Sequence, residues 1–264
     1  MELAGKVAVV TGGGNGIGAE LARRFAAEGA AAVLVADLDG DAAEAVAGRL
    51  RASGASAAAL AVDVSDEDQV RAMVAAAERK FGPVDVMVSN AGVATGLGIY
   101  APDQTFELAW RVNVMAHVYA ARAVIPGMLE RGSGYLLNTC SAAGLLIAPG
   151  DAPYTLSKNA AVAFAEYLAV TYGDKGIKVS ALCPQGVQTA MVLDGLDAGS
   201  PAAKAVVAAG ELLTVEQVAD CVVEGLAAER FLILPHPEVA TYVGYKAADR
   251  DRWISGVRRI MVED

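Results

Sequence analysis

The chain has 264 residues, of which 55% are hydrophobic and 20% are charged, and this balance excludes an intrinsically disordered protein. The net charge of −10 argues against a nucleic-acid partner, because proteins that bind nucleic acid usually carry a basic face. The apolar runs are short and none approaches the ~18 residues of a membrane span, so no membrane partner is expected.

The N-terminal segment and the cysteine count indicate the compartment, and the spacing of the cysteines and histidines bears on metal binding. The N-terminal segment lacks the basic start and the apolar core of a signal peptide, so we expect a cytoplasmic protein. A small, odd number of cysteines fits the reducing cytosol. None of these residues shows the CxxC or HxxxH spacing of a metal site, and we predict no metal and no disulfide framework. The residues concerned are Cys140, Cys183, Cys221, His117 and His236.

Short β-branched apolar runs alternate with longer helical patterns along the chain. We expect strands at residues 7–11, 32–36, 57–62, 84–89, 135–139, 177–182 and 231–234. A helix is expected after Ser65, which has Asp68 three residues on as in a capping box, and it ends at Gly82. Thr214 with Gln217 opens another helix in the same way. The alternation predicts an α/β fold with parallel strands, right-handed crossovers and helices on both faces of the sheet.

No linker or change in composition divides the chain, so residues 1–264 are expected to form a single domain. The connection at about residues 190–213 is either a substrate lid with short helices of its own or a mobile loop. A helical pattern with interleaved arginines predicts a C-terminal tail helix at about residues 237–264, packed on its own domain or on a sister subunit. His236, just before it, lies either in a surface turn or within reach of a neighbour's active site.

The segment from Thr11 to Gly18 follows the first expected strand and opens the first helix. Its glycines allow a tight turn and let the backbone approach a pyrophosphate, while the helix directs free N–H groups at that anion. Gly12, Gly16 and Gly18 give the spacing G-x-x-x-G-x-G, which differs from the G-x-G-x-x-G of the standard fingerprint. The position between a strand and a helix favours a dinucleotide site over a plain tight turn.

Asp37 ends the second expected strand. A carboxylate at this place can accept hydrogen bonds from the ribose of an adenosine. It would repel a 2′-phosphate by roughly 4 kcal/mol at ~4 Å and an effective dielectric of ~20. The neighbouring Leu38 and Asp39 provide no compensating cation. We therefore predict NAD(H) as the cofactor in preference to NADP(H).

Tyr154 and Lys158 are four residues apart on an expected helix, so they share a face. An ammonium group ~4 Å from the phenol would favour the phenolate by roughly 4 kcal/mol, or about three pKa units. The pKa of Tyr154 is thereby predicted to fall into the range useful for proton transfer near neutral pH. Ser141, at the carboxyl end of the fifth expected strand, is the third candidate catalytic residue.

Taken together and in this order, these residues resemble the short-chain dehydrogenase/reductase family, in its short branch. The resemblance covers the chain from Lys6 to about Leu234. It implies a Rossmann-type, doubly wound sheet of seven parallel strands in the order 3-2-1-4-5-6-7, with the ligand at the switch point of the sheet. The motifs that carry it are residues 11–18, Asp63 and Val64, residues 90–92, Asn113, Ser141, Tyr154 and Lys158.

The resemblance also implies the roles of the catalytic residues. Tyr154 is expected to act as the acid/base, and Ser141 to orient and polarise the substrate oxygen. Lys158 is expected to hold the nicotinamide ribose and to depress the pKa of Tyr154. Asn113 is expected to keep a kinked helix and a water that relays protons.

Contacts to the cofactor are implied in the same way. Asp63 is expected to face the adenine amine and Val64 the ring edge, while Val187 and Thr189 sit where the nicotinamide carboxamide would be bound. The full set of expected cofactor-binding residues is Gly12, Asn15, Gly16, Ile17, Gly18, Asp37, Leu38, Asp63, Val64, Asn90, Ala91, Gly92, Tyr154, Lys158, Pro184, Gly186, Val187 and Thr189.

One departure from the family pattern follows the sixth expected strand. Family members commonly carry Pro-Gly there, and this chain has Pro184 followed by Gln185. Gln185 lacks the access of glycine to positive φ. Its amide projects either toward the substrate or toward solvent, and the sequence leaves both interpretations open.

The expected pocket segments, residues 93–97, 142–147 and 191–196, are largely apolar and contain no Arg or Lys. A phosphorylated or dianionic substrate would usually need such a cation. We therefore predict an alcohol dehydrogenase or carbonyl reductase that uses NAD(H) to interconvert a secondary alcohol and a ketone on an uncharged, mostly apolar molecule.

Two other functions are compatible with parts of the sequence. A 3-oxoacyl-(acyl-carrier-protein) reductase would usually prefer NADPH and need basic docking residues, and Asp37 counts against it. A non-catalytic NAD(H)-binding sensor is disfavoured because Ser141, Tyr154 and Lys158 are all present. The resemblance further implies a homotetramer or homodimer, with the long helix from Asp103 past Asn113 at the interface.

Overall fold

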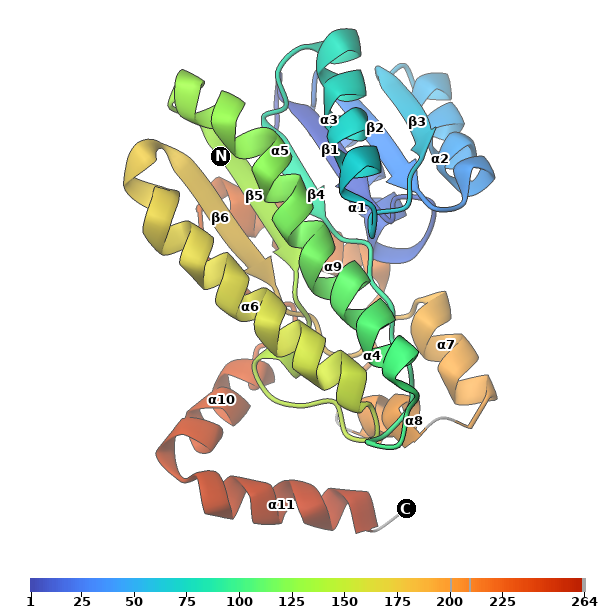
Figure 1. Cartoon of the computed structure of the whole chain (residues 1–264), viewed down its shortest axis with the longest axis vertical. Helices are drawn as coiled ribbons and strands as arrows, with labels where there is room; N and C mark the ends of the chain where they lie inside the picture. The colour runs from blue at the N-terminus through green and yellow to red at the C-terminus, as the bar shows by residue number, and fades with distance from the viewer. Residues whose placement is uncertain (200, 209, 263–264) are drawn as a thin grey trace.

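The strands form one parallel sheet (Figure 1), in a computed structural model that describes residues 1–199, 201–208 and 210–262. The sheet has seven strands in the order β3-β2-β1-β4-β5-β6-β7, which confirms the expected topology. Several strand ends differ from the expected ones by one or two residues. The strands are β1 (Val7–Thr11), β2 (Ala32–Asp37), β3 (Ala57–Ala61), β4 (Val86–Ser89), β5 (Gly134–Thr139), β6 (Ile177–Leu182) and β7 (Leu232–Ile233).

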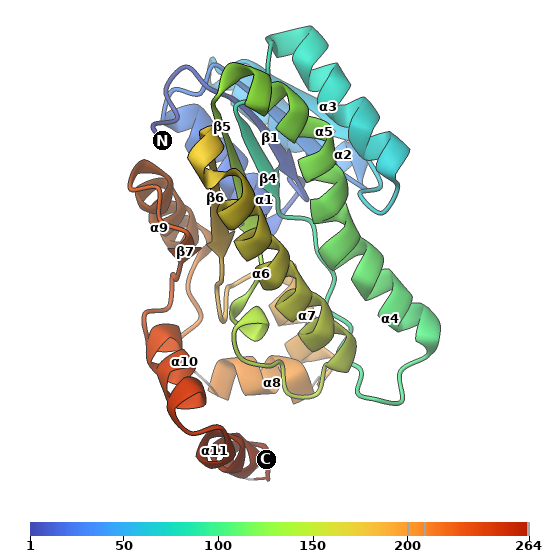
Figure 2. The ribbon, with the colours of Figure 1, turned by 60° about the vertical axis from the view of Figure 1, so that its left-hand side comes forward.

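Helices cover both faces of the sheet, as Figures 1 and 2 show. Helices α3, α5 and α6 pack on one face, and α1, α2 and α9 pack on the other. The helices and helical turns are α1 (Gly16–Ala27), α2 (Gly40–Ala52), α3 (Glu67–Phe81), α4 (Asp103–Trp110), η1 (Arg111–Met115), α5 (Ala116–Arg131), η2 (Ala142–Gly144), α6 (Ala152–Tyr172), η3 (Gly173–Lys175), α7 (Ala190–Asp197), α8 (Pro201–Ala208), α9 (Val215–Ala227), α10 (Glu238–Ala248) and α11 (Arg250–Val262).

Strand β1 shows why the strands are continuous apolar runs. Val9 is buried on the side of α3 and α5, while its neighbour Val10 is buried on the side of α1 and α2. Because helices cover both faces of a parallel sheet, successive side chains all need to be apolar. In an open sheet built this way, ligands bind outside the carboxyl ends of the strands.

Capping side chains define where two of the helices begin. The capping box of Thr214 with Gln217 is formed at the start of α9, as expected. The expected start of α3 at Ser65 is wrong by one residue, because Asp66 is the N-cap and accepts hydrogen bonds from two N–H groups of the first turn. Caps of this kind contribute ~1 kcal/mol each.

The expected lid and the expected tail, both after β6, each contain two short helices. The lid expected at residues 190–213 contains α7 and α8, and its residues 200 and 209 lie outside the described part. The expected single tail helix is wrong, because Asp249 is extended (φ −150°, ψ 97°) and separates α10 from α11. The Asp249 carboxylate accepts the N–H of Arg252 at 2.9 Å and so begins α11. Residues 263 and 264 of the tail lie outside the described part.

Helices α4 and α5 continue through η1 as one long helix, Asp103–Arg131. Among the residues that the structure describes, this is the one helix long and apolar enough, by length and composition alone, to cross a membrane. Arg111 and Arg122 interrupt its apolar runs, so the sequence of this helix contains no uncharged run as long as a membrane span. Half of its most apolar stretch is buried inside the protein, as in the core helix of a folded domain.

His117 of α5 is fully buried against β5. Its Nδ1 lies 3.0 Å from Oδ1 of Asn138, and its Nε2 has no hydrogen-bond partner in the described part of the chain. Burial, with the charge of Lys158 as a smaller cause, lowers the pKa of His117 from 6.5 to about 3. The native state therefore holds a neutral imidazole under conditions in which the unfolded chain takes up a proton.

Stability is accordingly expected to fall as the pH falls from 6.5 towards 3, because the unfolded state binds more protons than the native state in that window. At about pH 5 this loss amounts to about 2 kcal/mol, at 1.36 kcal/mol per pKa unit. The free energy of unfolding, measured in urea at about pH 7 and about pH 5, should fall by about 2 kcal/mol less in His117→Gln than in the wild type. Equal losses in the two proteins would contradict the assignment of this effect to His117.

Candidate active site

A cavity of about 1630 Å³ opens at the carboxyl ends of the strands, on the side where α7, α8, α10 and α11 lie (Figure 2). Gly18, Asn113 and Gly186 do not line it. The structure brings together all other residues expected from the sequence to form the site, namely Gly12, Asn15, Gly16, Ile17, Asp37, Leu38, Asp63, Val64, Asn90, Ala91, Gly92, Ser141, Tyr154, Lys158, Pro184, Val187 and Thr189.

The turn between β1 and α1 requires glycine. Gly12 has φ +61° and Gly16 has φ +52°, in the left-handed region that favours glycine. A Cβ at Gly12 would lie 2.8 Å from Cα of Ala91, closer than real Cβ atoms come. Gly18 packs against the carbonyl oxygen of Gly12, so the turn closes tightly behind the cavity. The turn thus leaves a backbone cradle that larger side chains would fill.

The start of α1 can hold an anion. Asn15 is the N-cap, yet its side chain makes no capping hydrogen bond, and the first turn contains no acidic residue. The N–H groups of this turn are therefore not satisfied by a capping side chain, and the positive end of the helix dipole adds to the attraction for an anion. Asn15, Gly16 and Ile17 all line the cavity. These features fit the pyrophosphate of a dinucleotide.

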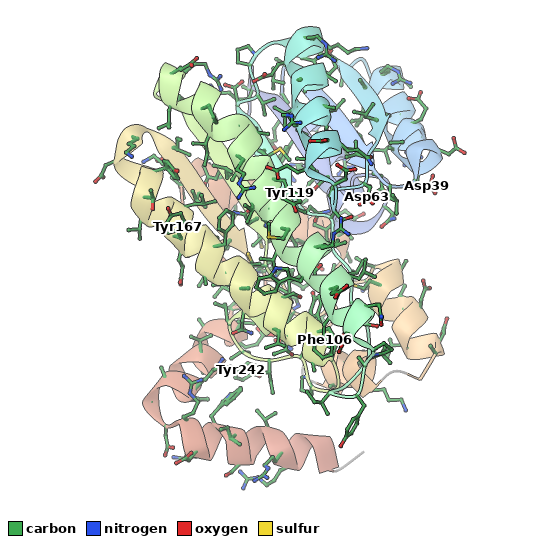
Figure 3. The ribbon with its side chains drawn as sticks, in the orientation of Figure 1. Asp39, Asp63, Phe106, Tyr119, Tyr167 and Tyr242 are labelled. Carbon is green, nitrogen blue, oxygen red and sulfur yellow. The ribbon has the colours of Figure 1, made fainter. Side chains whose placement is uncertain are left out.

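Asp37 is held at the cavity by two backbone N–H groups. Its Oδ2 accepts the N–H of Gly14 at 2.9 Å, and its Oδ1 accepts the N–H of Asp39 at 3.1 Å. Leu38 beside it is 75% exposed and carries no charge. Figure 3 shows Asp39 and Asp63 at the same edge of the sheet, where β2 and β3 end. This acidic edge suits ribose hydroxyls better than a further phosphate group.

Asn90 connects the carboxyl ends of three strands. Its Nδ2 donates to the carbonyl oxygens of Thr11 at 3.0 Å and Gly12 at 3.3 Å. Its Oδ1 accepts a hydrogen bond from Oγ1 of Thr139 at 3.1 Å. In return, Oγ1 of Thr11 accepts the N–H groups of Asn90 and Ala91. The turns after β1 and β4 are thereby fixed to each other at the switch point of the sheet.

Asn113 lies in η1, a π-helical turn between α4 and α5. A turn of this kind is the irregularity that we expected Asn113 to keep in the long helix. Its Oδ1 accepts the N–H of Val93 and its Nδ2 donates to the Val93 carbonyl, both at 2.9 Å. Nδ2 also donates to Oγ of Ser157 at 3.0 Å. Asn113 is fully buried, so its side chain positions the loop after β4 against the helix that carries Tyr154 and Lys158.

Ser141, Tyr154 and Lys158 meet at the cavity. Nζ of Lys158 lies 5.6 Å from the centroid of the Tyr154 ring and donates to the carbonyl oxygen of Thr139 at 2.8 Å. The Ser141 side chain lies close enough to Tyr154 to lower the pKa of its phenol, and its Oγ accepts the N–H of Ala143 at 3.2 Å. The φ of Ser141 is +69°, which is rare for a residue with a side chain and costs of order 1–3 kcal/mol. The fold therefore holds this hydroxyl at the phenol in a strained conformation.

The expected depression of the Tyr154 pKa is wrong in this structure. Burial raises the pKa of Tyr154 to about 12; the hydrogen bond of Ser141 opposes this rise and the charge of Asp151 adds to it. Lys158 directs its hydrogen bond to Thr139, and burial lowers the pKa of Lys158 itself. The phenol is therefore held neutral, and its deprotonated fraction grows as the pH rises towards its pKa.

Asp151, three residues before Tyr154, is a site residue that the sequence analysis missed. It is 2% exposed and caps α6 by accepting the N–H of Tyr154 at 3.0 Å. The same carboxylate accepts the N–H of Thr95 at 2.7 Å, its Oγ1 at 2.6 Å and the N–H of Gly96 at 2.6 Å. The Asp151 carboxylate thus fixes the loop after β4 to α6, the helix that carries Tyr154. The available signal was an aspartate at a helix start, a preferred N-cap.

The three expected substrate segments all contribute to the cavity, through Val93, Ala94, Thr95, Gly96, Ala142, Ala143, Leu146, Ile147, Met191, Val192, Asp194 and Gly195. The absence of Arg and Lys from these segments does not extend to the whole cavity. Lys204 of α8 and Arg252 and Arg259 of α11 also line the cavity. The segments themselves contain no cation, but the lid and the C-terminal helices bring these three side chains to the same space.

Gln185 lines the cavity, and its Oε1 is buried without a hydrogen-bond partner among the described residues. This favours the interpretation that the amide points inward rather than to solvent. The backbone N–H of Gln185 donates to Nδ1 of His236 at 3.1 Å. His236 is 2% exposed, so its expected place in a surface turn is wrong, and its ring supports this part of the wall.

Comparisons with known proteins agree with this arrangement. A family model described as short chain dehydrogenase matches residues 6–196. The chain is 37% identical over 242 residues to 1-deoxy-11-beta-hydroxypentalenate dehydrogenase of Streptomyces exfoliatus, covering 90% of this chain and 86% of that protein. It is 38% identical over 190 residues to 3beta-hydroxysteroid dehydrogenase 2 of Eggerthella lenta, covering 71% of this chain and 73% of that protein.

Among solved structures, a short chain dehydrogenase/reductase from Burkholderia phymatum in complex with NAD is similar over 95% of this chain and 96% of that chain. The TM-score is 0.87 at 31% sequence identity. With the sheet order, the glycine turn and the residues gathered at the cavity, these matches lead to one conclusion. The chain belongs to the short-chain dehydrogenase/reductase family of oxidoreductases.

Proposed function

We propose that the chain is an NAD(H)-dependent oxidoreductase that interconverts a secondary alcohol and a ketone. The observation that carries this proposal is the meeting of Ser141, Tyr154 and Lys158 in the cavity that also contains the glycine turn. A phenol, a hydroxyl and a buried ammonium group supply a proton donor, an orienting hydrogen bond and a positive charge at one place. Bound NAD⁺ would supply the hydride acceptor that side chains cannot provide.

Tyr154 is the acid/base in this proposal. Its phenolate accepts the hydroxyl proton when the alcohol is oxidised, and its phenol returns a proton to the oxygen when the ketone is reduced. Ser141 orients the substrate oxygen, since its side chain lines the same cavity beside the phenol. Lys158, whose Nζ lies 5.6 Å from the centroid of the Tyr154 ring, would hold the nicotinamide ribose. Asn113 keeps the π-helical turn at which a water relays protons.

Bound NAD(H) would be held by the residues that the sequence predicts for it. The glycine turn and the start of α1 bind the pyrophosphate, and the Asp37 carboxylate accepts hydrogen bonds from the adenosine ribose. Asp63 and Val64, which line the cavity, would face the adenine, and Val187 and Thr189 would bind the nicotinamide carboxamide. The NAD complex of the Burkholderia phymatum relative supports NAD(H) as the cofactor.

The substrate is a small molecule that is mostly apolar and uncharged around the reacting carbon. Leu146, Ile147, Met191 and Val192 provide an apolar lining on this side of the cavity. Relatives named as hydroxypentalenate and hydroxysteroid dehydrogenases support the same class of substrate.

We also propose that the chain assembles as a homotetramer or homodimer through the long helix of α4 and α5 together with α6. Large apolar side chains on α4 and α6 are exposed to between 47% and 86%. A gathering of such side chains favours burial against a sister subunit. The residues are Leu108, Trp110, Leu156, Tyr167 and Val170.

A panel of secondary alcohols incubated with NAD⁺ tests the proposed function, with the near-ultraviolet absorbance of NADH as the signal. We expect NADH to form with at least one cyclic secondary alcohol and more slowly with sugar phosphates. A preference for sugar phosphates would overturn the substrate class. Tight binding of NADH with no turnover of any alcohol or ketone would contradict the enzymatic function and favour a sensor.

A further inference from the structure

The C-terminal helices α10 and α11 lie beyond the carboxyl ends of the strands and form one wall of the cavity (Figures 1 and 2). They contribute three aromatic side chains, Tyr242, Tyr245 and Trp253, the first of which is labelled on α10 in Figure 3. We call these three residues the aromatic wall. The same cavity contains Ser141 and Tyr154, so the aromatic wall and the reacting end share one continuous space.

Lys246 of α10 joins this wall to the loop that follows Ser141. Its Nζ donates hydrogen bonds to the carbonyl oxygens of Leu145 at 2.7 Å and Leu146 at 3.0 Å. The same Nζ lies 5.2 Å from the centroid of the Trp253 ring, within the range of a cation–π interaction. One ammonium group therefore holds both the loop and α11 against α10.

The loop that Lys246 holds is part of the substrate side of the cavity. It follows directly on the helical turn η2, whose N-cap is Ser141, and Leu146 lines the cavity. Burial of the Lys246 side chain, with a smaller effect of Arg250, lowers the pKa of Lys246. The two carbonyl acceptors compensate for the lost solvent, so the side chain is fixed rather than free. The contact thus sets the spacing between the Ser141 loop and the aromatic wall.

We propose that the aromatic wall is a second binding region of the cavity, remote from the reacting oxygen, which binds an extended apolar ring system of the substrate. Lys246 is the positioning residue that sets the distance between the aromatic wall and the Ser141 loop. Aromatic side chains bind flat apolar rings through their faces and edges. A substrate with one ring binds at the reacting end alone, whereas fused rings reach the wall. This inference rests on the proposed function for the identity of the reacting end.

Two kinds of secondary alcohol distinguish the regions. Cyclohexanol presents the reacting ring alone, whereas androsterone and its 3β epimer add three fused rings to it. In Lys246→Met we expect the KM of the active steroid epimer to rise about tenfold, with kcat/KM for cyclohexanol changing by less than about threefold. Lys246→Arg keeps the charge and the donors, so it should restore most of the steroid KM.

Lys175→Met is the matched control. It removes a lysine that lies at the same 5.2 Å from an aromatic ring, that of Tyr172, but belongs to the turn η3, none of whose residues lines the cavity. We expect both substrates to keep their wild-type constants in this variant. Equal losses for cyclohexanol and steroid in Lys246→Met, or no loss for either, would overturn the proposal.

Fluorescence gives a readout that does not depend on turnover. The chain has two tryptophans, so Trp110→Phe leaves Trp253 as the single emitter. In the presence of NADH, androsterone should quench this emission saturably, and Lys246→Met should weaken its apparent Kd about tenfold. An unchanged emission overturns the second binding region even if the protein oxidises alcohols. Saturable quenching without turnover of any alcohol contradicts the proposed function and supports the region itself.

Discussion

Tyr154→Phe is expected to lower kcat for alcohol oxidation by about 10²–10⁴-fold, the range that a positioned acid–base group contributes. The substitution deletes one hydroxyl and keeps the ring that lies beside Lys158. The glycine turn and Asp37 are untouched, so the affinity for NADH, measured by fluorescence titration, should stay within about threefold of the wild type. Retained full activity would contradict the assigned role.

The acid–base role of Tyr154 predicts the direction in which the rate of the wild type changes with pH. Burial raises the pKa of Tyr154 to about 12 in this structure. Below that value the phenolate fraction grows about tenfold per pH unit, so alcohol oxidation should accelerate as the pH rises. Ketone reduction needs the neutral phenol and should not share this increase. The residual rate of Tyr154→Phe should lack the rise, and an unchanged slope in the variant would assign the titration to another group.

The double variant Asp37→Ser, Leu38→Arg is expected to shift the cofactor preference towards NADP(H). Removing the carboxylate abolishes a repulsion of roughly 4 kcal/mol with a 2′-phosphate at ~4 Å. Leu38 is 75% exposed, so a guanidinium group there can pair with that phosphate. The ratio of kcat/KM for NADH to that for NADPH should fall by about 10²–10³-fold. An unchanged ratio would show that Asp37 does not face the ribose.

Asp39→Ser provides the control for this experiment. Asp39 is the N-cap of α2 and accepts two N–H groups of the first turn, at 3.0 Å each. Serine is also a good N-cap, so the helix start should persist while one negative charge leaves the same edge of the sheet. The cofactor ratio should change by less than about threefold in this variant, because a charge outside the ribose site is largely screened.

Much of the fold was predictable because its signals are local in the chain. Parallel strands buried on both faces appear as short apolar runs, and the glycine turn between β1 and α1 is contiguous. Once the sheet order is known, Asp37, Asn90 and Ser141 fall at the carboxyl ends of β2, β4 and β5, which lie along one edge of the sheet. The cavity therefore gathers residues that are far apart in the sequence but sit at equivalent positions.

The part that could not be predicted depends on contacts between distant segments. Tyr242 and Arg252 reach the cavity because α10 and α11 fold back over the strand ends, and no periodicity of the tail specifies that direction. His236 is buried because it pairs with the backbone of Gln185, more than fifty residues earlier. The break at Asp249 depends on a single extended residue inside an otherwise helical pattern.

The direction of the Tyr154 pKa was missed for a related reason. The sequence places Lys158 one turn away, which predicts a nearby positive charge. The sequence does not show that the phenol is buried or that Lys158 donates its hydrogen bond to Thr139. It also does not show that the charge of Asp151 acts on the phenol. Desolvation then outweighs the attraction that spacing alone suggests.

Cyclohexanol carrying deuterium on the hydroxyl-bearing carbon, or the steroid alcohol labelled in the same way, provides the most direct measurement. If this cavity transfers hydride from a secondary alcohol to NAD⁺, mass spectrometry should find the NADH that forms carrying the deuterium, and the initial rate in single turnover should fall with a primary isotope effect. NADH that contains no deuterium, or ketone that appears without any reduction of NAD⁺, would contradict hydride transfer at this site.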